Sequence, residues 1–265
     1  MYAKEAVTSS LVMPLTLATA LMAPTFSTAQ ASAVSRVDGR AEVLTAAYCA
    51  DRDKVIRPRS AYPDTKIGEQ NYRLQSSRME IAVACLVNQE RAAQGLPGVS
   101  VPRILCRIGP GAKCPPAGLG GAAYDHASEA VKLRWWTTVA NYPSCTPRKD
   151  DTNTSRDESL LCDPHVNPVT RSTPQQRAQE RGYGRNCSGG WKMAENVYTA
   201  AGRNDLVTPK AAFDWWMSSP GHRANILNPE FNSMSVRVML GSADPTTGST
   251  EPAATYVQMF GRCYS

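Results

Sequence analysis

The sequence predicts an α+β fold in which helices precede a small antiparallel sheet. Stretches with helical signals come first, and two strand-like stretches near the C-terminus are joined by a Gly-, Ser-, Thr- and Pro-rich segment at 241–252. Strands joined by a hairpin pair antiparallel, so this order argues against a parallel sheet with alternating helices. The 265 residues are enough for one substantial core.

Residues 1–33 have the features of a secretory signal peptide. Lys4 supplies a weak positive region, an apolar stretch runs from 11 to 24, and Ala-Ser-Ala at 31–33 offers small residues for cleavage. The apolar stretch is shorter than the roughly 20 residues that a membrane-spanning helix needs. We therefore expect a secreted, extracellular protein without a transmembrane segment, and a retained N-terminal anchor is the alternative.

The first helices are expected after an N-terminal extension at 34–73. Apolar residues recur at helical spacing over 74–94, and Gly95 stops the pattern. A second helix is expected over about 122–140. Loop insertions are expected near 98–121 and 141–164, because the first segment is rich in Pro and Gly and the second is polar. These boundaries leave 74–265 as the main domain.

Two later helices begin with capping signals. Thr173 followed by Gln176 makes a capping box, and Thr208-Pro209 repeats the Thr-Pro start before a helix with a Trp-Trp pair. Pro220-Gly221 should break that helix and hold His222 on a fixed turn. Beyond it, apolar residues at 234–240 alternate with others and predict a strand with one face largely buried, paired with a strand at 254–261.

Eight cysteines follow the predicted signal peptide, and none forms a C-x-x-C motif, which leaves a zinc ribbon unsupported. An even number in an exported chain predicts four disulfides, whose connectivity the spacing does not fix. Candidate pairings are Cys106–Cys114 and Cys145–Cys162, which would close local loops, and Cys187–Cys263, which would tie the region of Glu195 to the C-terminus; Cys49 and Cys85 complete the set.

The formal net charge is +6, but the basic residues are scattered, with no dense run and no interleaving with aromatic residues of the kind that binds single strands. A nucleic-acid partner is therefore not expected. Weak attraction to anionic wall polymers or lipid headgroups is compatible with this charge.

The candidate site residues are His165, Glu195 and His222. The chain has only three histidines, and two of them belong to this set. Two imidazoles and a carboxylate are the ligands of an open, catalytic-type zinc site, and they can also perform acid–base chemistry without metal. In the alternatives, Glu195 belongs to a turn, His222 caps the preceding helix and His165 is merely exposed. His126 is expected to be structural.

Six blocks in sequence resemble the bacterial CAP superfamily (SCP-like extracellular domain), which groups cysteine-rich secretory proteins, venom antigens and plant pathogenesis-related proteins. The blocks are Leu86 to Pro97, His165-Val-Asn167, Arg177 to Tyr183, Glu195-Asn-Val197, Ala212 to Leu227 and Tyr256 to Gly261. The resemblance covers about residues 76–263 and implies an α–β–α sandwich, with a small antiparallel sheet between helices. It also implies a central cleft with a His/Glu tetrad, often described as binding zinc, in which His165 and Glu195 match one histidine and one acid.

The other two tetrad positions depart from the family pattern. Ser219, or Ser218 if the first Trp of the pair is counted, stands where the family has Glu, and Thr255 stands where it has His. Bacterial members with the Ser-Pro-Gly-His-Arg block offer a different histidine, which is His222 here. The implied cleft therefore consists of His165, Glu195 and His222.

Three functions follow as hypotheses. The first is a secreted binding module whose cleft takes a lipid, a cell-wall fragment or a protein. The second is a zinc-assisted hydrolase or peptidase, with zinc on His165 and His222 and with Glu195 as third ligand or general base. The third is a structural or defence protein that acts through surface loops, chiefly 141–164.

Overall fold

A computed structural model describes residues 34–37, 40–43, 49–101, 117–148, 160–248 and 251–265. The chain separates into two units, Met1–Ala31 and Ser32–Ser265, and the description concerns the second. The predicted signal peptide and the Cys106–Cys114 pairing lie outside the described residues, as do parts of both predicted insertions. A short antiparallel pair, β1 (Val34–Val37) and β2 (Arg40–Val43), precedes the main elements.

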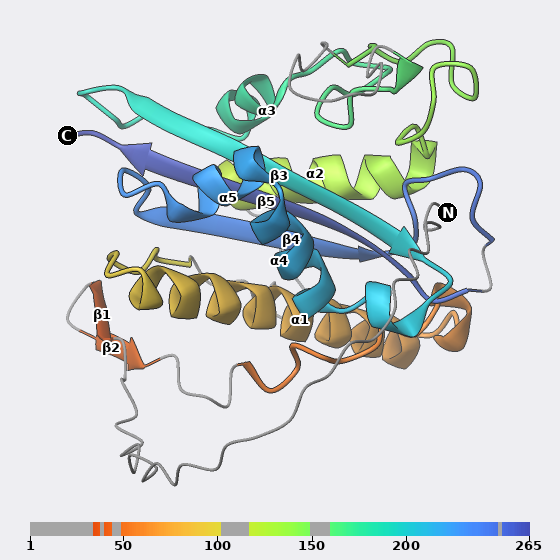
Figure 1. The fold of residues 1–265 in the computed structure, drawn as a ribbon, viewed down its shortest axis with the longest axis horizontal. Helices are drawn as coiled ribbons and strands as arrows, with labels where there is room; N and C mark the ends of the chain where they lie inside the picture. Colours follow the sequence, from red (N-terminus) through yellow and green to blue (C-terminus); the bar gives the residue numbers. More distant parts are fainter. Residues whose placement is uncertain (1–33, 38–39, 44–48, 102–116, 149–159, 249–250) are drawn as a thin grey trace, which may run out of the picture. The chain divides into compact units, whose positions relative to one another are not determined.

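The central sheet has three antiparallel strands in the order β3-β5-β4 (Figure 1). They are β3 (Trp191–Ala201), β4 (Ser233–Leu240) and β5 (Ala253–Cys263). The predicted hairpin of β4 and β5 is confirmed. The strand β3, which carries Glu195, was not predicted; it pairs with β5 along its length and forms one edge of the sheet.

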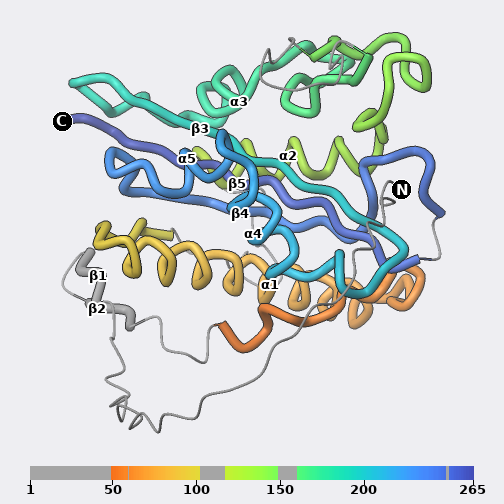
Figure 2. Tube along the Cα trace, viewed as in Figure 1, coloured from red at the N-terminus to blue at the C-terminus, as the bar shows by residue number. Residues whose placement is uncertain are grey.

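Helices cover both faces of the sheet. They are α1 (Lys66–Ala93), α2 (Gly118–Leu133), α3 (Pro174–Glu180), α4 (Pro209–Ser218) and α5 (Pro220–Leu227). Figure 2 shows α1 and α2 running on either side of the strands. Side chains of β4 and β5 such as Val236 and Tyr256 pack into one core with α1 and α4, whereas Val257 and Met259 pack into another with α2. The predicted α+β class and its α–β–α sandwich are confirmed.

Burial on both faces corrects the prediction that β4 has one largely buried face. Arg237 lies between the apolar residues of β4, yet it is buried because it forms an ion pair of 2.8 Å with Glu80 of α1 and donates to the carbonyl of Gly120. Arg237, the charged residue in the alternating pattern, therefore faces the interior of the protein and not the solvent.

The ends of α1 and α2 differ from the predicted ends. α1 begins at Lys66, inside the predicted extension, because Thr65 caps it by accepting a hydrogen bond from the Gly68 amide. α2 stops at Leu133, since Arg134 adopts a left-handed conformation with φ 56°.

The two capping predictions are confirmed, whereas the predicted turn at His222 is wrong. Thr173 and Gln176 form the reciprocal capping box of α3, and the Thr208 side chain caps α4. Pro220 does not lead into a turn but occupies the first turn of α5, where its fixed φ suits helix initiation and its missing N–H leaves no unsatisfied donor. His222 therefore belongs to a helix.

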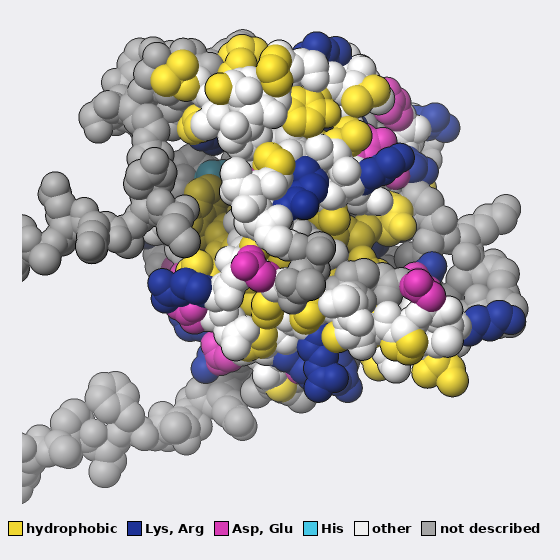
Figure 3. All heavy atoms as spheres, turned by 90° about the vertical axis from the view of Figure 1, so that its right-hand side faces the viewer, with side chains coloured by type: hydrophobic (Ala, Val, Ile, Leu, Met, Phe, Trp, Pro, Cys, Tyr) yellow, Lys and Arg dark blue, Asp and Glu magenta, His cyan; other side chains and the backbone are white. Residues whose placement is uncertain are grey.

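Three disulfides join the described residues. The pairings Cys145–Cys162 and Cys187–Cys263 are confirmed, and Cys49–Cys85 fastens the segment before α1 to that helix. On the face drawn in Figure 3, basic and acidic side chains are interspersed with apolar ones. Among the described residues, no helix is long and apolar enough to cross a membrane.

Candidate functional site

The site is built around Glu195 on the edge strand β3. Its side chain is only 1% exposed, and the Arg177 guanidinium donates to both of its carboxylate oxygens at 3.0 and 2.9 Å. His165 places its Nδ1 atom 2.9 Å from Glu195 Oε1. Sequence reasoning placed His165 and Glu195 in one site, and the structure brings them into direct contact.

Arg177 is the central residue that sequence reasoning did not assign. It lies on α3, and besides its bonds to Glu195 its Nη1 atom donates to the carbonyls of His165 at 3.0 Å and Ser172 at 2.8 Å. One side chain therefore fixes both the carboxylate and the loop that carries His165. The sequence feature that could have pointed to Arg177 is its place directly after a capping box, in a block that resembles the family.

The carboxylate of Glu195 is held in its charged form. Burial by itself would raise its pKa, but the positive charge of Arg177, that of His126 when protonated, and the hydrogen bond from His165 outweigh that effect and lower the pKa to about 2. At neutral pH Glu195 is ionised and both of its oxygens accept hydrogen bonds. It is therefore poorly suited to accept or donate a proton.

His165 is the solvent-facing member of the group. Its backbone amide donates to Asp163 Oδ1 at 2.8 Å, and its side chain is 28% exposed. Because the charged Glu195 accepts from Nδ1–H, the other ring nitrogen, Nε2, remains available to a ligand. This carboxylate–imidazole pair orients the ring.

His126 of α2 lies behind the pair. It is fully buried, its Nε2 atom is 2.8 Å from the Pro164 carbonyl oxygen, and the same atom is 3.8 Å from Glu195 Oε1. Burial lowers the pKa of His126 to about 3, so the ring is neutral at pH 7. Its contacts are those of a packing residue, as the sequence led us to expect.

His222 lies near this group but bonds to neither Glu195 nor His165. Its Nδ1 atom forms a 2.8 Å hydrogen bond with Ser219 Oγ, and its ring packs on Trp215 with 4.8 Å between centroids. Burial, followed by the positive charges of His165 and Arg148, lowers its pKa to about 4. His165 is thus close enough to act on His222 electrostatically.

A buried amide network connects His222 to the strand that carries Glu195. Asn196 donates to the His222 carbonyl at 3.2 Å and to Gln258 at 2.9 Å, and it accepts from Asn225 of α5 at 2.8 Å. Because successive side chains of a strand point to opposite faces, Glu195 and Asn196 serve opposite sides of β3. His165 and His222 therefore flank one sheet edge from two faces.

The three predicted residues do not fit a three-ligand zinc site. Both oxygens of Glu195 already accept hydrogen bonds from Arg177, and a zinc ion would have to compete with that guanidinium. Across the described part of the chain, no group of three or more His, Cys, Asp or Glu side chains could hold a metal ion. What remains for zinc is the pair of imidazoles.

Comparison with known proteins agrees with the resemblance in the sequence. Residues 161–260 match the model of the Cysteine-rich secretory protein family, CAP, so the predicted resemblance to the CAP superfamily is confirmed over this part of the chain. The match includes His165, Glu195 and His222. No curated protein matches the chain.

Three solved structures from bacteria align with the chain. An extracellular protein containing a SCP domain from Bacillus anthracis is 18% identical, with a TM-score of 0.39 over 76% of this chain and 44% of its own. An outer surface protein from Borrelia burgdorferi is 12% identical, with a TM-score of 0.36 over 68% and 90%. A cysteine-rich secretory protein from Staphylococcus aureus is 13% identical, with a TM-score of 0.35 over 70% and 38%. The chain thus spans less than half of the first and third proteins.

Proposed function

We propose that this protein is a secreted, non-catalytic binding domain whose ligand contacts the sheet edge between His165 and His222. The ligand classes are a lipid, a cell-wall fragment or a protein. The observation that carries the proposal is the locked carboxylate: Glu195 is ionised, buried and bonded through both oxygens to Arg177. A general base needs a pKa near the working pH, and a pKa of about 2 is far from it.

The exposed groups of the site suit recognition. His165 offers one ring nitrogen in a fixed orientation, and Trp215 and His222 offer adjacent aromatic surface. Hydrogen-bonding groups set into apolar surface are the usual composition of a ligand site. The three disulfides support export, because such bonds persist in oxidising compartments. Fractionation of expressing cells tests export directly.

The proposal is tested by assaying hydrolysis of casein, peptidoglycan and a lipid ester by the oxidised protein and by Glu195→Ala. We expect no turnover by either protein above that of buffer. Turnover by the wild type that Glu195→Ala abolishes, in a variant whose thermal melt shows it folded, would contradict a non-catalytic role.

A zinc-assisted hydrolase or peptidase is the second candidate, and one observation favours it. The Nδ1 atoms of His165 and His222 are bonded to Glu195 and Ser219, which would leave their Nε2 atoms for metal. Partners on the second ring nitrogen commonly orient metal-binding histidines. A bound zinc ion would supply Lewis-acid chemistry.

Zinc titration by calorimetry into the metal-stripped protein tests this candidate. Tight binding at one ion per chain that is lost in both His165→Ala and His222→Ala would support it, and absence of binding to the folded wild type would remove it. The third candidate, action through surface loops, depends on 141–164, and residues 149–159 lie outside the described part.

A further inference from the structure

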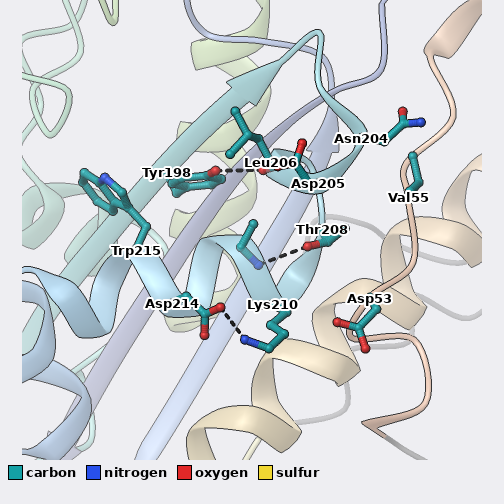
Figure 4. Close-up of a pocket in the computed structure, with 11 residues that line it drawn as sticks. Asp53, Val55, Tyr198, Asn204, Asp205, Leu206, Thr208, Lys210, Asp214 and Trp215 are labelled. Carbon is teal, nitrogen blue, oxygen red and sulfur yellow. Dashed lines mark hydrogen bonds and ion pairs between the residues drawn. The ribbon is translucent and has the colours of Figure 1, made fainter. Parts of the chain in front are cut away.

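A pocket on the α4 side of the sheet edge shares only Trp215 with the ligand site proposed above. Its volume is about 540 Å³, within the roughly 300–1,000 Å³ common for small-ligand pockets. It is lined by parts of four segments: Asp53, Val55, Tyr198, Asn204, Asp205, Leu206, Thr208, Lys210, Ala211, Asp214 and Trp215. Figure 4 shows Trp215 and Tyr198 at one end, Asp53 and Val55 at the other, and Lys210 and Asp214 along α4 between them.

We propose that this pocket binds a neutral saccharide. Trp215 provides an aromatic platform at one end: it lies on α4 and is 44% exposed, and Tyr198 lies 5.7 Å from it between ring centroids. The electron-rich face of an aromatic ring attracts the weakly positive C–H groups that cover one face of a pyranose. Large exposed aromatic side chains in a pocket are the feature that such a sugar face requires.

The Tyr198 hydroxyl is already occupied, so its ring is what it offers to a ligand. It donates to the Leu206 carbonyl at 2.7 Å, and this bond holds the 3-10 helix Asn204–Leu206 against β3. The two aromatic rings and the peptide segment of Leu206 therefore form a fixed wall, and no loop closure is needed to build it.

The polar part of the lining offers both donors and acceptors without an excess of charge. Each carboxylate has a cationic neighbour: Asp53 pairs with Arg52, Asp205 with Arg203, and Asp214 with Lys210. Hydroxyl groups both donate and accept, so a sugar can use carboxylate oxygens and the Lys210 ammonium in the same site. A metal cation would gain little free energy by binding here, because each carboxylate already has a basic side chain beside it.

The same charges argue against an acyl chain as the occupant. Four acidic or basic side chains line the pocket, namely Asp53, Asp205, Lys210 and Asp214. Covering them with hydrocarbon would remove their hydration without supplying hydrogen bonds, which costs free energy. Trp215 also packs on the His222 ring, but His165, Glu195 and His222 do not line the pocket.

The test is calorimetric titration of the oxidised protein with cellotriose, maltotriose and triacetylchitotriose, up to millimolar concentration. We expect at least one of them to bind saturably at one per chain, Trp215→Ala to weaken that binding at least tenfold, and Trp215→Phe to retain part of it. Lys192→Ala, which alters an exposed ion pair with Glu230, is the matched surface control and should bind as the wild type does. Thermal melts establish that each variant is folded.

Three results would overturn the proposal: no binding of any of the three sugars, binding that Trp215→Ala leaves unchanged, and sugar binding abolished by His165→Ala. The last result would locate the sugar in the sheet-edge cleft. Conversely, sugar binding that survives His165→Ala supports the pocket, whatever becomes of the function proposed for the cleft.

Discussion

Two buried carboxylate–arginine pairs in this protein have opposite electrostatic character. Glu195 accepts two hydrogen bonds from Arg177 and one from His165, and its pKa falls to about 2. Glu80 is bonded to Arg237 and to the Val238 amide, yet burial dominates and raises its pKa to about 7. Both carboxylates are almost inaccessible to water, so burial alone does not decide the charge of such a group.

The difference lies in how completely each charge is compensated. Arg177 grips both oxygens of Glu195, and His165 adds a third donor from the solvent side. Glu80 accepts from Arg237 at one oxygen and from the uncharged Val238 amide at the other, and Arg237 also donates to the Gly120 carbonyl. A fully compensated charge can hold an exposed ring such as His165 in place, whereas the Glu80 pair joins α1 to β4 in the interior.

The largest effect is expected when Arg177 is replaced. Arg177→Met leaves the ionised Glu195 buried without its main partner and should lower the free energy of unfolding by about 3–5 kcal/mol. Arg237→Met should cost only about 1–3 kcal/mol, because Glu80 can take up a proton near neutral pH. Urea unfolding at pH 7 compares the two variants. Equal losses would show that the pairs do not differ as described.

Replacing the acids tests the same contrast from the other side. Glu195→Gln should cost about 1.5–3 kcal/mol at pH 7, since it removes hydrogen bonds to a charged acceptor. Glu80→Gln should lower the free energy of unfolding at pH 7 by about 1 kcal/mol or less. Burial raises the pKa of Glu80 to about 7, so its side chain is already partly neutral at that pH. A larger loss in Glu80→Gln would reverse the assignment of the two pairs.

The pH dependence of stability should have opposite sign for the two acids. The depressed pKa of Glu195 gives stability that is present above its ordinary value of 4.5 and lost as the pH falls toward 2. The raised pKa of Glu80 gives stability that is present below 4.5 and lost as the pH rises through about 7.

The advantage of the wild type over Glu195→Gln should therefore shrink below about pH 4.5, and its advantage over Glu80→Gln should shrink between about pH 4.5 and 7. Unfolding free energies measured from about pH 2.5 to 8 give both differences. Parallel curves for the two variants would contradict the contrast.

The smallest effects should come from the caps of the helices that carry one member of each pair. Thr173→Ala at the start of α3 and Thr65→Ala at the start of α1 should each cost about 1 kcal/mol. Only Thr173→Ala should also shift the NMR signals of the His165 ring, because α3 carries Arg177. Shifts in both variants would indicate that the His165 signals report general destabilisation.

The sequence predicts the elements that have a regular apolar pattern. It misses β3 and the first turns of α1, in which polar residues interrupt that pattern. The hairpin of β4 and β5 follows from alternation and the caps follow from Thr-Pro pairs. β3 was missed because Glu195 and Asn196 are buried in hydrogen-bond networks, so the strand lacks an apolar alternation. The first turns of α1 were missed because they are mostly polar, although Thr65 carried a capping signal.

The candidate site was predicted only in part. Residue type and a family resemblance were enough to select His165, Glu195 and His222. They could not reveal that Arg177 takes both oxygens of Glu195, because that contact depends on how α3 packs against β3. The role of Glu195 therefore changes from candidate base or ligand to a charged anchor for His165.

The central claim is that Glu195 is permanently ionised and orients His165 instead of transferring protons. The most direct test is the carbon-13 NMR titration of the Glu195 carboxyl group, assigned with Glu195→Gln, from pH 8 down to the onset of acid unfolding. We expect that its signal does not titrate above about pH 3. A titration midpoint at or above about pH 5 would contradict it and would restore Glu195 as a candidate general base.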